Sequence, residues 1–199
     1  EFSCRRHQDW VPVLWFKLTP TDNIITPGIA VYPPRIVRNI THMRAMVSDP
    51  RRLCPHVKTH KCEEILNLFL DCGVSQFKCS TLAELEMVAR CQAEFGLLAM
   101  QPVGPNAARL VELARQFPQT KVATVVDNQD TLKEIERVAA NSSVDLTVFV
   151  DIDNGMGRTG IRCGDECFEV YARLVESESV RVGGLHVYDG HIHDHDLSE

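Results

Sequence analysis

Short hydrophobic runs alternate with amphipathic stretches along most of this 199-residue chain. The short runs are rich in Val and Leu, which is typical of strands covered on both faces. They span 53–58, 76–79, 97–100, 122–126, 146–152 and 182–187. Between them, apolar residues recur at helical spacing in 62–72, 81–94, 106–117, 129–140 and 165–175. Strands that alternate with helices predict a parallel α/β sheet, either a (β/α)8 TIM-type barrel or an open doubly wound sheet.

Two features of the strand ends favour the barrel. Polar residues follow several successive strands instead of gathering at one switch point: Lys58, Lys78, Gln101, Asp127, Asp151 and Tyr188. In addition, the first strand is not followed by the glycine-rich fingerprint that an open dinucleotide-binding sheet often shows. Six strands are visible in the sequence, whereas a closed barrel needs eight. We therefore predict a partial barrel.

The segment before the first barrel strand has a different pattern. Residues 26–32 are β-rich after a Pro-Gly turn, and Pro33 then begins an amphipathic helix. The resulting division is a leader at 1–25, a strand and helix at 26–50, and the incomplete barrel at 51–199. Because the chain starts without Met and stops just after a histidine-rich segment, we expect it to be a fragment of a longer protein.

Composition narrows the class of partner. The net charge is −6, which does not favour a nucleic acid or an anionic membrane. No apolar run approaches the roughly 18 residues that a membrane span needs. Eight cysteines are scattered without a C-x-x-C pair, so we expect a thiol-rich cytoplasmic protein and no zinc site.

The segment 55–61 contains the first candidate for covalent chemistry. Lys58 is predicted at a strand end, which is the chemically active end of an α/β barrel. Desolvation and neighbouring cations can lower the pKa of such a lysine and free its lone pair for Schiff-base formation. The alternative is that Lys58 is an ordinary surface lysine.

Other candidate residues follow the later strands. Arg158 projects from the glycine-rich loop 154–160, where a guanidinium suits an anionic oxygen. Alternatively, it pairs with Asp151 or Asp153. Gln101 either contacts a ligand or caps a strand.

Histidines alternate with other residues near the C-terminus, at His191, His193 and His195. Imidazoles on one side of an extended segment could form a metal clip. The same residues could supply an acid or base, or belong to a polar loop.

Taken together, these motifs resemble the D-threonine aldolase and D-serine dehydratase-like enzymes, whose N-terminal barrel is of the alanine racemase type. The resemblance runs from about residue 26 to 196 and rests on 55–61, 77–84, 101–105, 150–160 and 184–190. It implies pyridoxal 5'-phosphate as cofactor, a small D-amino acid as substrate and, by analogy, a homodimer. In this family, the strand at 26–32 would join a C-terminal β-domain that this chain lacks.

The resemblance also implies residue roles. Lys58 would form the Schiff base, Arg158 would face the phenolic oxygen of the cofactor, and Tyr188 would lie near its pyridine nitrogen. Gln101 would be a further cofactor contact. His191 or His193 would lie near the β-hydroxyl of the substrate. The divalent-metal ligands of the family would lie beyond residue 199, so we assign no metal ligand within this chain.

The implied reaction is aldol cleavage of a D-threonine-like β-hydroxy-D-amino acid to glycine and an aldehyde. Dehydration of D-serine or D-threonine and amino-acid racemisation are alternatives within the same fold. A third alternative is that the chain is a non-catalytic truncated fragment.

Overall fold

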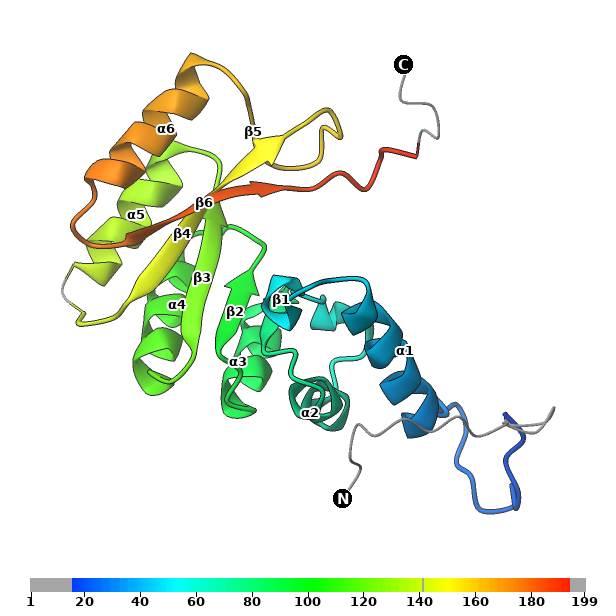
Figure 1. Ribbon diagram of the computed structural model, residues 1–199. Coiled ribbons are helices and arrows are strands. Elements are labelled where there is room, and N and C mark those ends of the chain that lie inside the picture. Colours follow the sequence, from blue (N-terminus) through cyan, green and yellow to red (C-terminus); the bar gives the residue numbers. More distant parts are fainter. Residues whose placement is uncertain (1–15, 141, 194–199) are drawn as a thin grey trace.

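A computed structural model describes residues 16–140 and 142–193 and shows one parallel sheet (Figure 1). The sheet order follows the chain: β1 (Gln76–Cys79), β2 (Phe95–Leu98), β3 (Lys121–Val126), β4 (Leu146–Asp153) and then β6 (Arg181–Val187). The short β5 (Ile161–Arg162) pairs with the end of β4. Because the order never reverses, the sheet has no switch point and belongs to the barrel class, as predicted.

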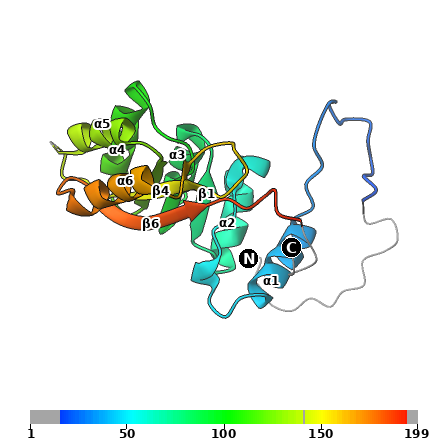
Figure 2. The same ribbon diagram turned by 90° about the horizontal axis from the view of Figure 1, so that it is seen from above.

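The helices that alternate with the strands cover one side of the sheet (Figures 1 and 2). They are α2 (Glu63–Asp71), α3 (Leu82–Arg90), α4 (Pro105–Gln116), α5 (Gln129–Ala139) and α6 (Asp165–Glu176). The main core lies between helices and strands, where Phe77, Leu110 and Leu146 are fully buried. Among the described residues, no helix is long and apolar enough to cross a membrane.

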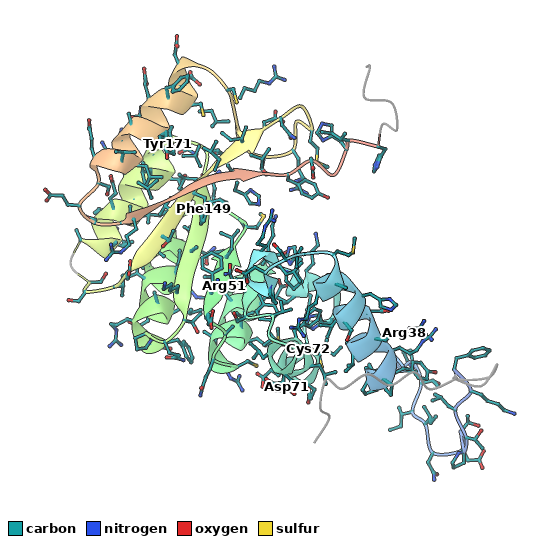
Figure 3. The ribbon with its side chains drawn as sticks, viewed as in Figure 1. Arg38, Arg51, Asp71, Cys72, Phe149 and Tyr171 are labelled. Atoms are coloured by element: carbon teal, nitrogen blue, oxygen red, sulfur yellow. The ribbon has the colours of Figure 1, made fainter. Side chains whose placement is uncertain are left out.

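The other side of the sheet is concave and forms the barrel interior. Side chains alternate between the two faces of a strand, so Leu97, Ala123 and Val125 make a second, smaller cluster there. Phe149, labelled in Figure 3, packs against this cluster and covers Gly183, where a Cβ atom would lie 2.4 Å from its ring. The same alternation places Lys78, Asp151 and His186 on this concave side.

The prediction of a strand at 53–58 is wrong. Only His56 forms an isolated bridge, opposite Lys78, and the chain then enters the 3₁₀ turn η2 (Val57–Thr59). Two local features explain this. Pro55 has no backbone N–H to donate to a sheet, and the N–H of Lys58 donates to the His56 imidazole.

The strands and helices predicted from residue 62 onward are confirmed, most of them with shifted ends. β2 begins at Phe95, before the expected start, and α3 ends at Arg90 rather than continuing to residue 94. β5 was missed because two residues carry no detectable period. The helix α1 (Pro33–Ala45) begins at Pro33 as predicted and packs through Ile40 against Val74.

Residues 26–32 do not form the predicted strand. Ile29 is 93% exposed, and within the described residues no strand lies alongside this segment. β-rich composition alone does not make a strand, because the backbone N–H and C=O groups need a neighbouring strand. Residues 16–25 of the expected leader are exposed and irregular, and residues 1–15 lie outside the described part of the chain.

Leu110 tests the main core. We expect Leu110→Ala to lower the free energy of unfolding by about 2–5 kcal/mol, because it leaves a cavity between α4 and the sheet. Urea unfolding followed by circular dichroism would measure the change. Val175→Ala, at a side chain that is 57% exposed, is the matched control and should have little effect; equal losses would contradict the assignment of the core.

Candidate active site

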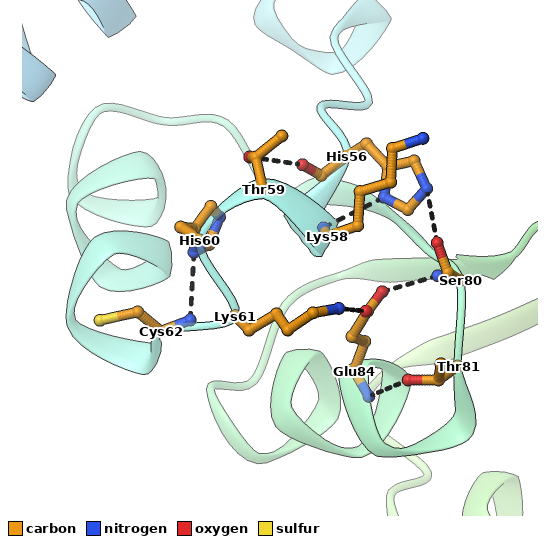
Figure 4. Close-up of polar contacts among 9 residues, drawn as sticks. All are labelled: His56, Lys58, Thr59, His60, Lys61, Cys62, Ser80, Thr81 and Glu84. Atoms are coloured by element: carbon orange, nitrogen blue, oxygen red, sulfur yellow. Dashed lines mark hydrogen bonds and ion pairs between the residues drawn. The ribbon is translucent and has the colours of Figure 1, made fainter. Parts of the chain in front are cut away.

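The turn that carries Lys58 lies at the carboxyl end of the sheet (Figure 4). Val57 is fully buried and anchors the turn, while the Lys58 side chain is exposed. The His56 Nδ1 atom accepts the Lys58 N–H at 3.3 Å, so Nε2 carries the ring hydrogen and donates to the Ser80 hydroxyl at 3.1 Å. Burial, followed by the charges of Lys58 and Lys78, lowers the pKa of His56 and favours this neutral ring.

A buried carboxylate holds the turn against the sheet. Glu84, which is 4% exposed, accepts a hydrogen bond from the Lys61 ammonium and another from the Ser80 N–H at 2.7 Å (Figure 4). The Thr81 hydroxyl caps the N-terminus of α3, the helix that contains Glu84, by accepting the Glu84 N–H. Burial alone would raise the pKa of Glu84, but Lys61 and Ser80 outweigh it, and the pKa is lowered.

The glycine-rich loop after β4 is folded by two aspartates. Asp153 Oδ1 accepts the N–H groups of Gly155 and Gly157 at 3.1 and 2.9 Å, and these bonds lower its pKa. The N–H of Gly160 donates to Asp127 Oδ2 at 3.1 Å. Gly160 has φ +99°, and a Cβ there would lie 2.6 Å from the Asp153 nitrogen, so this position requires glycine.

Arg158 extends from this loop over the ring of Tyr188, with its guanidinium carbon 4.2 Å from the ring centroid. This is a cation–π distance. The two aspartates considered as its partners are engaged elsewhere: Asp151 contacts His186 at 2.5 Å and Asp153 contacts Arg162 at 3.7 Å. Arg158 therefore contacts Tyr188, and the alternative in which it pairs with Asp151 or Asp153 is not what the structure shows.

The concave side contributes a second lysine. Lys78 Nζ lies 2.7 Å from His186 Nε2 and 5.6 Å from the Tyr188 ring centroid. Burial is the main cause that lowers the pKa of Lys78. The charges of Arg158 and Lys58 lower it further, whereas those of Cys54 and Asp151 raise it. Lys78 and Arg158 thus both lie over the Tyr188 ring, and the charge of Lys58 acts on Lys78.

Lys78 and Asp151 stand out in the sequence as polar residues at strand ends. His186, whose imidazole contacts both of them, was not predicted as a site residue. The available signal was strand alternation, because Lys78, Asp151 and His186 all occupy the face opposite the main core. Their mutual contact could not be read from that signal.

The predicted histidines have different surroundings. His191 lies beside the glycine-rich loop, since a Cβ on Gly155 would be 3.4 Å from its Nε2. His193 is exposed, and His195 lies outside the described residues. Within 16–140 and 142–193, no three His, Cys, Asp or Glu side chains are placed to hold a metal ion.

Gln101 joins two strand ends. Its Oε1 accepts the Asp127 N–H at 3.2 Å and the Asn128 side-chain N–H at 3.1 Å. These contacts agree with the strand-capping alternative. Contact of Gln101 with a cofactor stays a prediction.

The fold and this group of cations define an α/β barrel segment with an amine-bearing site at the carboxyl ends of its strands. Residues 27–199 match the family described as "Alanine racemase, N-terminal domain". The chain belongs to this family, as its motifs suggested.

Known relatives agree with the resemblance. D-threonine aldolase of Arthrobacter sp. is 24% identical over 87% of this chain and 45% of its own length. D-threo-3-hydroxyaspartate dehydratase of Delftia sp. is 25% identical over 87% of this chain and 46% of its own length. The crystal structure of D-threonine aldolase from Filomicrobium marinum superposes with a TM-score of 0.76 at 24% identity, covering 84% of this chain and 45% of that one. The chain thus spans about half the length of these relatives.

Gly160 provides a test of the loop geometry. We expect Gly160→Ala to lower the free energy of unfolding by about 1–3 kcal/mol, because alanine is strained at this φ and clashes with the Asp153 backbone. Urea denaturation would measure the loss. Gly164→Ala is the matched control, since its backbone is extended and no atom lies within 4 Å of the added Cβ. If both variants were as stable as the parent, the described loop conformation would be incorrect.

Glu84 provides a test by pH. Its folded-state pKa is lowered, so its contribution to stability is complete above the ordinary value of 4.5 and is lost as pH falls through the lowered pKa. We expect Glu84→Gln to cost roughly 1–3 kcal/mol at neutral pH and to flatten the acid side of the stability–pH curve. The control is Glu86→Gln on the exposed side of the same helix. An unchanged acid limb in Glu84→Gln would exclude the buried ion pair.

Proposed function

We propose that this chain is the cofactor-binding part of a pyridoxal 5'-phosphate-dependent lyase that cleaves β-hydroxy-D-amino acids to glycine and an aldehyde. The observation that carries the proposal is that Arg158 and Lys78 lie over the Tyr188 ring and that the charge of Lys58 acts on Lys78. Lys58, Arg158 and Tyr188 also occur in the order that the family resemblance implies. The relatives named above support a D-amino acid as the substrate.

The residues present fit such a cofactor. Among the described residues, the Lys58 side-chain nitrogen makes no hydrogen bond or ion pair, and its side chain is exposed, so after losing a proton it can react with an aldehyde. Lys78 and Arg158 supply further positive charge near Tyr188, which suits an anionic ligand. When bound, the cofactor would supply an electron sink for cleavage of a bond to Cα.

Each residue would have a limited task. Lys58 would attach the cofactor and release it to the substrate amine. Arg158 would donate hydrogen bonds to an anionic oxygen, and Tyr188 would orient the bound ring. His191, beside the Gly155–Gly160 loop, would take the proton of the β-hydroxyl as the Cα–Cβ bond breaks.

A second candidate is dehydration of the same class of substrate. It is favoured by the Delftia dehydratase, whose identity and coverage are close to those of the Arthrobacter aldolase. The two reactions share the cofactor site and differ in their products. Aldol cleavage releases glycine and an aldehyde, whereas dehydration releases a keto acid and ammonia.

Cofactor attachment is the first test. We expect the purified chain to develop a visible absorbance band with pyridoxal 5'-phosphate, and borohydride reduction followed by peptide mapping to place the label on Lys58. Lys58→Ala should lose the band, because it removes the reacting amine. The matched control is Lys121→Ala at the opposite, exposed end of β3, which should keep it. Label spread evenly over surface lysines would refute the proposal.

Product analysis then separates the two reactions. The loaded protein would be incubated with D-threonine, and glycine and 2-oxobutanoate would be quantified. Glycine would support the aldolase, and 2-oxobutanoate would support the dehydratase.

A further inference from the structure

A chain of three polar side chains crosses the concave side of the sheet. Lys78 from β1 contacts His186 from β6, and His186 Nδ1 contacts Asp151 from β4 at 2.5 Å. β1 and β6 lie at opposite ends of the sheet order, and the sheet must curve for them to meet (Figure 1). Asp151 is only 5% exposed, and the His186 side chain only 11%. The contact is therefore part of the barrel interior.

The hydrogen bonds define where the protons lie. An ionised carboxylate only accepts, so His186 Nδ1 carries the hydrogen toward Asp151. The lone pair on Nε2 then faces Lys78 and accepts a hydrogen from its ammonium at 2.7 Å. This arrangement directs the Lys78 proton toward the imidazole.

A transfer of that proton would leave the total charge unchanged. Before the transfer, Lys78 is an ammonium and His186 is neutral. Afterwards, Lys78 is a neutral amine and His186 is an imidazolium stabilised by Asp151. Because both states have the same net charge, neither adds an uncompensated charge to the half-buried interior. The pair can thus present Lys78 as an acid or as a base.

We infer that Lys78 exchanges a proton with the Cα atom of the bound amino acid, and that His186 and Asp151 are positioning residues that share and direct this proton. This inference rests on the proposed function, because it requires an amino acid bound in the same site. Both candidate reactions need such a transfer. Aldol cleavage ends with protonation of Cα to form glycine, and dehydration begins with removal of the Cα proton.

Atoms and charges balance in both reactions. In aldol cleavage, an N–H bond of the Lys78 ammonium breaks and a C–H bond forms at Cα with the electron pair left by the departing aldehyde. Lys78 becomes a neutral amine and regains a proton from solvent. In dehydration, the neutral amine takes the Cα proton, the electron pair left at Cα passes toward Cβ, and hydroxide leaves with a proton as water.

The surroundings favour a proton carrier over a fixed ammonium. The positive charges of Arg158 and Lys58 repel the Lys78 ammonium. Asp151, Cys54 and the Tyr188 ring also lie near it, from β4, the segment before η2 and the segment after β6. Burial is the largest cause that lowers the Lys78 pKa, and repulsion by Arg158 and Lys58 adds to it, while the charges of Cys54 and Asp151 oppose it. The neutral amine is therefore more accessible here than in water.

The sharing of the proton can be tested without cofactor. Trace labelling with acetic anhydride across a pH series, followed by peptide mapping, reports the neutral fraction of Lys78. Two ionisable groups that interact strongly lose their protons in two steps. We therefore expect the neutral fraction of Lys78 to rise with pH in two steps. His186→Gln keeps an acceptor near the Nε2 position but cannot take the proton, and it should give one step. His42→Gln, on the exposed side of α1, should keep two. A single step matching an N-acetyl-lysine amide standard in the parent would overturn the inference.

The transfer to Cα can be isolated with glycine, which lacks a β-hydroxyl. We expect the cofactor-loaded protein to exchange the α-hydrogens of glycine in deuterium oxide, as followed by proton NMR. Lys78→Met and Lys78→Arg should slow this exchange at least about a hundredfold while the Lys58 band remains. Arginine is the decisive variant, because it keeps the positive charge but does not release its proton. Lys121→Met should exchange as the parent does.

The outcomes separate the two proposals. Absence of the visible absorbance band in the parent protein would refute the proposed function. The labelling curves would still decide whether Lys78 and His186 share a proton. A band on Lys58 with undiminished exchange in Lys78→Arg would overturn the inference and leave the proposed function intact. A cofactor label on Lys78 instead of Lys58 would also overturn it.

Discussion

The position of the candidate site depends on the buried carboxylate of Glu84. An unpaired charge at this depth would be strongly unfavourable, so both of its oxygens need donors. One donor is Lys61, just after the turn that carries Lys58, and the other is the N–H of Ser80, just after β1. Together with the His56–Ser80 hydrogen bond and the His56–Lys78 bridge, this side chain therefore joins the reactive turn to the sheet.

The charge of the site follows from how the acids are paired. Asp153 and Asp127 accept backbone N–H groups of the glycine-rich loop, and Asp151 contacts His186. With these carboxylates satisfied by the protein itself, the nearby Lys58 and Arg158 can serve an anionic ligand. The whole chain has a net charge of −6, so the positive edge is a local property that the total charge does not reveal.

The places where the sequence pattern failed share a physical cause. Residues 53–58 look like a strand by composition, yet Pro55 and the His56 side chain remove the backbone pairing that a strand needs. Residues 26–32 are β-rich but have no strand beside them in the described part of the chain. Periodicity reports which side chains prefer burial, whereas strand formation also requires a partner for each backbone group.

The sequence by itself determined the alternation of helices and main strands from residue 62 onward, the barrel class and the family. It also singled out Lys58, Arg158 and Tyr188. Arg158 and Tyr188 follow β4 and β6, whose hydrophobic patterns are strong, whereas Lys58 was found although the strand predicted before it does not form. Only the tertiary structure decided that Gln101 joins two strand ends, that Arg158 packs on Tyr188, and that His186 links Lys78 to Asp151. Lys78 and His186 are 108 residues apart. They meet because the sheet curves, and that curvature arises from the packing of all the strands and helices together, which no local stretch of sequence encodes.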